Sequence, residues 1–319
     1  MLSLGLLAST SVHFEPSQLV GIPFALVGAV FMSVGAQLQH SGVGKVDSDT
    51  AATEKSALNI RQLFALLSRP SWLFGTVMLG LAVVFQLVSL GYSPIIVVQP
   101  IGAVALVLTA IINSRVSKVK LNRASIIAIT MCVGGIALFV TVAAFTAVNA
   151  PVLPEDLVQI LIILGFIMLI LATLYMILRH RPSALFYILG AGVLYGFVAT
   201  LAKVVEARLF SNHMDALLWI ALGALLLAAI IGGLFVQNAY SSGPPDLVIA
   251  GLTVIDPLVA VCIGIVILDE ASQAPGWAVA VYVIAGAIAV AGVFLMARVH
   301  PQSTGETGEV PPLPDTRVS

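Results

Sequence analysis

Nine long apolar stretches dominate the sequence and constrain its fold more than any other feature. A helix needs about 20 largely apolar residues to cross the hydrocarbon core of a bilayer. Stretches of this kind lie at approximately 19–43, 71–91, 93–114, 124–147, 155–178, 183–207, 215–238, 246–268 and 274–298. Only 9% of the residues are charged and 60% are hydrophobic, whereas a soluble domain has about 25% charged residues. We therefore predict an all-α polytopic membrane protein with nine transmembrane helices.

The basic residues predict how the chain is oriented in the membrane. If the N-terminus lies outside, all of the 14 Lys and Arg residues except Lys203 and Arg208 fall in inner loops or in the C-terminal tail. An excess of Lys and Arg marks the cytoplasmic side. We predict a multi-pass protein of the cell (plasma) membrane with its N-terminus outside and its C-terminus in the cytoplasm. The net charge of -1 gives no basic surface for nucleic acid.

Three segments are predicted to lie outside the membrane. Residues 1–18 form an extramembrane lead-in, and residues 299–319, rich in Pro, Gly and acidic residues, form a disordered cytoplasmic tail. Residues 44–70 form an inner loop. Helical spacing of apolar residues in this loop predicts a short interfacial helix, and these residues are Ile60, Leu63, Phe64 and Leu67.

The spans group as four, one and four, which predicts an inverted repeat. The first transmembrane repeat covers 19–147, the linking fifth helix covers 148–182 and the second repeat covers 183–298. The third span contains Gln99-Pro100, and the eighth contains Asp256-Pro257 at the matching position. Because each half has an even number of spans, the lone fifth helix makes the second half enter the membrane from the opposite side. Paired proline-interrupted spans in two inverted halves indicate the binding site of a transporter.

The two prolines and their neighbours are the strongest candidates for that site. Pro100 and Pro257 each remove a backbone hydrogen bond and bend or break a helix, and freed backbone groups at this depth need protein or water beside them. We expect both to line a polar cavity. Asp256 lies close to the membrane midplane, where a charge costs about 2.5 to 3.5 kcal/mol on insertion scales. It is a substrate or proton site, the N-cap of a helix that restarts at Pro257, or both.

Other polar residues in the spans allow two interpretations. Amide side chains either line a polar path or join helices through hydrogen bonds, and they are Gln37, Gln86, Gln99, Gln237 and Asn238. Lys203 and Glu206, three residues apart, are expected to pair on the solvated surface of one helix end. Asp269 and Glu270 fall at the end of a loop and are expected to be solvated.

Two segments resemble a known family of transporters. The segment from Pro94 to Ala103 resembles the stretch between spans two and three of the NIPA magnesium-transporter-like proteins, and the second half resembles their ending through Pro257, Ile265, Asp269-Glu270 and Gly276-Trp277. With the four-one-four plan, the chain resembles the drug/metabolite transporter superfamily, closest to its NIPA and EamA-like branches. This resemblance implies inverted helical repeats and transport of small solutes. It does not extend to the first-span glutamate of the small multidrug exporters, because the first span here has no acidic residue.

The leading hypothesis is a secondary transporter that moves a small metabolite or drug-like solute by alternating access. The first alternative is a divalent-cation transporter for Mg²⁺, in which Asp256 would be a hard oxygen ligand. The other alternative is a non-transporting membrane scaffold. Partners would be the solute or ion and the lipid bilayer, and a homodimer stays open. The chain has no HExxH, G-x-S-x-G or Walker sequence, so we expect neither enzymatic activity nor a cofactor.

Overall fold

The structure is a computed structural model that describes residues 19–49, 70–116, 123–178, 184–212, 214–242 and 245–299. Within these ranges the chain is helical and contains no strand. The helices are α1 (Gly21–Asp49), α3 (Pro70–Tyr92), α4 (Ile95–Gly102), α5 (Val104–Val116), α6 (Arg123–Thr146), α7 (Pro154–Leu178), α8 (Ala184–Phe210), α9 (Ala216–Ser242), α10 (Pro245–Val266) and α11 (Gly276–Val299). The predicted lead-in, the interfacial helix near residue 64 and the tail beyond residue 299 lie outside the described residues.

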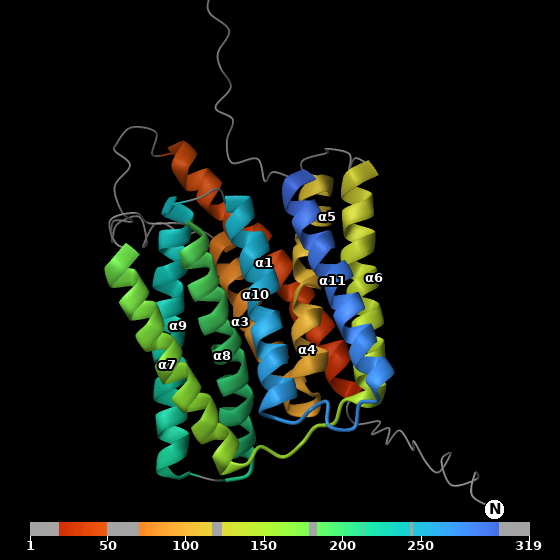
Figure 1. Ribbon diagram of the computed structural model, residues 1–319. Helices are drawn as coiled ribbons and strands as arrows, with labels where there is room; N and C mark the ends of the chain where they lie inside the picture. Colours follow the sequence, from red (N-terminus) through yellow and green to blue (C-terminus); the bar gives the residue numbers. More distant parts are fainter. Residues whose placement is uncertain are drawn as a thin grey trace, which may run out of the picture.

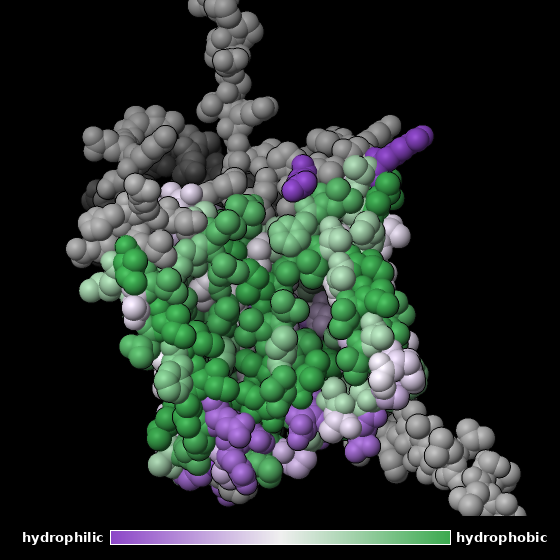
Figure 2. All heavy atoms as spheres, in the orientation of Figure 1, coloured by the Kyte–Doolittle hydropathy of each residue, from purple (hydrophilic) through white to green (hydrophobic). Residues whose placement is uncertain are grey.

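The described part of the chain holds 9 helical stretches long and apolar enough to cross a membrane, with α4 and α5 together forming one of them. This number confirms the nine predicted spans and indicates a multi-pass membrane protein. The surface agrees, because Figure 2 shows a broad hydrophobic band around the middle of the molecule with hydrophilic residues at its lower end. Large apolar side chains of the predicted spans, such as Phe74, Phe166 and Val283, are exposed, as expected for helices surrounded by a bilayer.

The helices lie side by side and alternate in direction, so each end of the bundle collects a defined set of helix ends (Figure 1). The helices α1, α4, α7, α9 and α11 begin at the lower end in Figure 1. We call this end the Glu270 end, after the residue in its α10–α11 loop. The other end is called the opposite end. The distribution of basic residues predicts that the Glu270 end faces outside.

The closest helix pairs are α1 with α3, α6 with α11, and α8 with both α9 and α10. The short helix α4 lies inside the bundle, where it packs against α1, α6 and α10. The helix α7 packs mainly against α8 and α9 among the described helices. It lies at the edge of the bundle in Figure 1. The α8 span and the span formed by α4 and α5 are the most buried of the described spans, so the interior of the molecule is built around α4 and α8.

Glycines allow α6 and α11 to approach each other closely. A Cβ atom on Gly135 would lie 2.6 Å from the backbone nitrogen of Ala289, and one on Gly292 would lie 2.5 Å from that of Cys132. Backbones at this separation leave no room for a side chain, which is how small residues join helices in membranes. The neighbouring Gly134 faces away from this contact, with nothing within 4 Å of its Cβ position.

The two prolines have different effects on their helices. After Pro100, α4 ends at Gly102 and α5 begins at Val104, with the N–H of Ala103 donating to the Pro100 carbonyl at 3.2 Å. This break confirms the prediction for the third span. In contrast, α10 continues through Pro257, so the interpretation of Asp256 as the N-cap of a restarted helix is wrong. A second helix-weakening residue, Gly102, follows Pro100, whereas no glycine lies directly after Pro257.

Candidate functional site

The two proline positions meet in the middle of the bundle. Pro100 from α4 and Pro257 from α10 line one open cavity of about 90 Å³, whose other walls are formed by α6 and α11. Figure 2 shows the surface hollowed between α10 and α11 at this place. The other lining residues are Ala103, Ile136, Phe139, Thr253, Val254, Leu258, Val261, Gly286, Ala289, Val290 and Val293. Almost all of these side chains are apolar, so the expectation of a polar cavity at the prolines is wrong.

Asp256 precedes Pro257 in the middle of α10 and does not itself line this cavity. Its Oδ1 atom is buried and has no hydrogen-bond partner among the described residues. A buried acceptor without a partner costs about 1 to 3 kcal/mol, and more when it is charged. The carboxyl group is therefore a place where a proton, a cation or a donor on a bound solute would be stabilised.

Glycines on α8 bring that helix against the backbone of Asp256. A Cβ atom on Gly192 would lie 2.7 Å from the Ile255 Cβ, and one on Gly196 would lie 3.0 Å from the Asp256 carbonyl oxygen. Tyr195, between the two glycines, is close enough to Asp256 for the two side chains to interact electrostatically. Its ring lies against α9, where a Cβ atom on Gly232 would be 3.0 Å away. A phenol thus stands near the carboxyl group, which composition and spacing did not predict.

The predicted amide residues do not gather around Asp256 as one set. Gln99 is buried on α4 next to Pro100, and Gln37 and Gln86 are half-buried on α1 and α3. Gln237 and Asn238 are exposed on α9. Asn238 donates to the carbonyl of Leu234 in its own helix at 2.7 Å. Of the predicted site residues, the structure brings Pro100 and Pro257 together at one cavity, whereas Asp256 lies against α8.

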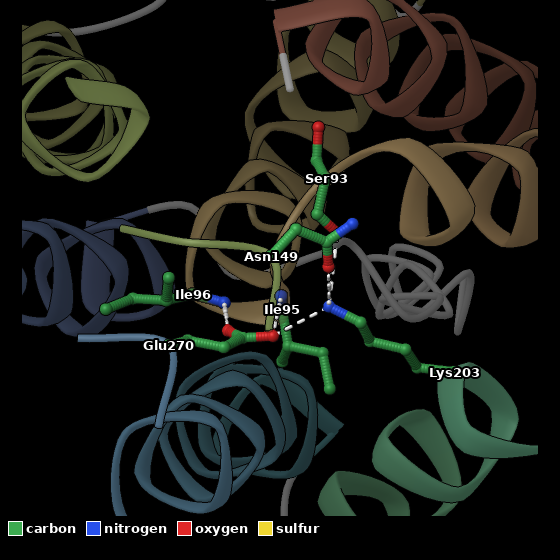
Figure 3. Close-up of polar contacts among 6 residues, drawn as sticks. All are labelled: Ser93, Ile95, Ile96, Asn149, Lys203 and Glu270. Carbon is green, nitrogen blue, oxygen red and sulfur yellow. Dashed lines mark hydrogen bonds and ion pairs between the residues drawn. The ribbon is translucent and has the colours of Figure 1, made fainter. Parts of the chain in front are cut away.

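A second polar cluster, which sequence reasoning missed, lies at the Glu270 end. Glu270 is only 1% exposed, so the prediction that it is solvated is wrong. Its Oε1 accepts from the N–H of Ile95 at 2.8 Å and its Oε2 from the N–H of Ile96 at 2.9 Å. Lys203 Nζ donates to Oε1 at 2.7 Å. Figure 3 shows these groups around the carboxylate, which joins α4, α8 and the α10–α11 loop.

Glu270 provides the hydrogen-bond acceptors that the N-terminus of α4 lacks locally. The first N–H groups of a helix have no partners inside the helix, and Pro94 at the N-cap of α4 provides no side-chain hydrogen bond. A carboxylate satisfies these N–H groups and is stabilised by the helix dipole. Glu270 does so from far along the chain. The one sequence signal for this contact is the absence of a local capping residue before Ile95.

Lys203 forms no hydrogen bond with Glu206, the residue predicted to be its partner, among the contacts of the described residues. Besides Glu270, it donates to Asn149 Oδ1 at 3.0 Å and to the Ser93 carbonyl at 3.4 Å. The predicted pair with Glu206 on a solvated surface is therefore wrong, because Lys203 is only 5% exposed and its three donors are used elsewhere. Glu206 Oε2 is buried without a hydrogen-bond partner among the described residues. The Oε1 atom of Glu206 lies close to the backbone of Gly91, where a Cβ atom on residue 91 would be only 2.5 Å away.

Asp215, outside the spans at the same end, forms an ion pair with Arg208 and accepts from the N–H of Leu218 at 3.1 Å. Desolvation raises the pKa of this carboxyl group, but the Leu218 N–H and the Arg208 guanidinium outweigh it and lower the pKa from its usual value. Within the described residues, no three His, Cys, Asp or Glu side chains come together in a group that could hold a metal ion.

Comparisons with known proteins give one relative of similar length. The chain is 24% identical over 263 residues to an uncharacterized protein of Corynebacterium glutamicum, and the match covers 82% of this chain and 89% of that protein. No protein-family model matches the chain. No solved structure matches it either.

Proposed function

We propose that the protein is a secondary transporter that moves a small metabolite or drug-like solute across the membrane by alternating access. The observation that carries this proposal is the buried, unpartnered Oδ1 of Asp256 in the middle of a predicted membrane span. Ionisable groups at such a depth are costly and mark substrate or ion pathways. A neighbouring break in the α4–α5 span adds backbone groups that can rearrange.

The pairing of helices supports an inverted repeat of spans one to four and six to nine. The pair α1 and α3 in the first half corresponds to α8 and α9 in the second, and both pairs are closely packed. The spans that correspond to each other also touch, since α4 packs against α10 and α6 against α11. Under our proposal the two halves rock about these central contacts, and access to Asp256 alternates between the two sides of the membrane.

The substitution Asp256→Asn tests the proposal. The amide keeps the shape of the side chain but is neutral, so it cannot hold a cation or exchange a proton. Purified protein in liposomes would be assayed for transport of a panel of amino acids, toxic amines and Mg²⁺. We expect at least about a tenfold loss of transport in the variant, with normal insertion. The matched control is Glu155→Gln, because Glu155 is an exposed carboxylate on the peripheral helix α7. Parental transport by Asp256→Asn would refute the assignment of this site.

A further inference from the structure

The cluster at the Glu270 end contains two carboxylates, the buried Glu270 and the half-buried Glu206, for the buried ammonium group of Lys203. Lys203 pairs with Glu270 at 2.7 Å, while Glu206 Oε2 has no partner among the described residues. Lys203 and Glu206 are nevertheless neighbours on α8, because residues three apart lie on one face of a helix, and the two side chains interact electrostatically. Lys203 can therefore reach Glu206 by rotation of side chains alone.

The Glu270 contacts also hold this end of the bundle together. The carboxylate binds the start of α4, and the backbone of Glu270 accepts from the N–H of Val148 at 2.8 Å and donates to the carbonyl of Gly264 at 3.0 Å. The α6–α7 connection, the α10–α11 loop, α4 and α8 meet at this one residue. If the loop moved away from α4, Lys203 would lose its buried counter-charge, and an unpaired buried charge is strongly destabilising.

We propose that Lys203 is an ion-pair switch that controls a gate at the Glu270 end. In the present closed conformation Lys203 binds Glu270 and Glu206 stands unpaired. When the α10–α11 loop withdraws, Lys203 exchanges Glu270 for Glu206, so the ammonium group keeps a counter-charge in both states. Glu270 meanwhile becomes solvated at the loop surface. This inference rests on the proposed alternating access, since a gate is needed only where access alternates.

The switch predicts opposite effects for two similar substitutions. Glu270→Gln removes the pair of the closed state and leaves that of the open state, so the gate should open. Glu206→Gln removes the unpaired carboxylate of the closed state and the pair of the open state, so the gate should close. A purely structural cluster would be loosened by either change.

Labelling of a buried reporter measures the gate without any cargo. Val97→Cys, in α4 and 1% exposed, would be the reporter in a chain carrying Cys132→Ala and Cys262→Ala, reconstituted in nanodiscs so that both faces are accessible. Relative to this parent, we expect Glu270→Gln to raise the rate of reaction with a hydrophilic maleimide at least about tenfold and Glu206→Gln to lower it at least about threefold. Glu155→Gln, an exposed carboxylate at the same end, should leave the rate unchanged.

Opposite signs for the two carboxylates would support the switch, whereas an increase or no change with Glu206→Gln would overturn it. If Glu270→Gln does not fold, the Glu206→Gln result decides alone. This readout is independent of the transport assay: unchanged uptake by Asp256→Asn would reject the proposed solute site, and the labelling rates would still report whether Lys203 exchanges partners.

Discussion

A buried carboxylate is stable only when neighbouring groups compensate its charge, and two carboxylates in this protein differ in how they meet that requirement. Glu270 accepts hydrogen bonds from two backbone N–H groups at the start of a helix and from Lys203. Asp256 has an Oδ1 without any partner among the described residues. The first arrangement stabilises one conformation. The second leaves an acceptor free for a ligand, which is why we assign ligand binding to Asp256 and stabilisation of the closed conformation to Glu270.

The dependence of Glu270 on Lys203 can be measured by removing the ammonium group. Lys203→Met leaves the carboxylate buried without its cation, and breaking a buried pair in this way costs about 3 to 5 kcal/mol. We expect a clearly lower thermal midpoint in detergent. The double variant Lys203→Met with Glu270→Gln should be more stable than Lys203→Met alone, because the uncompensated charge is gone. A double variant less stable than the single one would contradict this account.

At the scale of helices, close contacts depend on which face a glycine occupies. Gly134 and Gly135 are adjacent in sequence, and glycines in membrane helices tend to pack between helices. Only Gly135 contacts α11, because one residue turns the side-chain direction by about 100° around a helix. The α6–α11 pair joins the fourth span to the ninth, so this contact holds the two halves of the chain together.

A single methyl group tests the α6–α11 contact. Gly135→Ala places a Cβ atom 2.6 Å from a backbone nitrogen of α11, and such overpacking costs about 1 to 3 kcal/mol. We expect a lower thermal midpoint and a lower yield of monodisperse protein. Gly134→Ala is the matched control, since its Cβ atom would meet nothing within 4 Å and alanine favours the helix. Equal effects of the two substitutions would show that the helices separate more easily than the structure implies.

The features of the fold that the membrane imposes, namely the number and position of the spans, were predictable from the sequence. A stretch that crosses the bilayer must form its backbone hydrogen bonds internally, as a helix does. Length and composition were therefore enough to place the helices. The break after Pro100 was also predictable, because it is a local property of Gln99-Pro100 and Gly102. The contact of Lys203 with Glu270 was not, since it joins residues 67 positions apart. A local partner, Glu206, matched the helix-pair rule but is not the one used.

The orientation of the whole molecule remains a prediction from its basic residues. With the native Cys132 and Cys262 replaced by alanine, we expect Ala150→Cys at the Glu270 end to react with an impermeant maleimide added outside intact cells. Arg298→Cys, exposed near the opposite end, should react only after the cells are opened, because Lys and Arg concentrate on the cytoplasmic side. The reverse pattern would invert the predicted topology.

The cap on α4 has a consequence for how the protein is made. Ile95 and Glu270 are 175 residues apart, so the N–H groups at the start of α4 are synthesised long before the carboxylate that binds them. At about 5 to 20 residues per second, this delay lasts roughly 10 to 35 s. During that time the N–H groups at the start of α4 need other acceptors, such as water, lipid headgroups or the insertion machinery. The cap on α4, which belongs to the first half of the chain, therefore forms only after the eighth span, α10, has been synthesised.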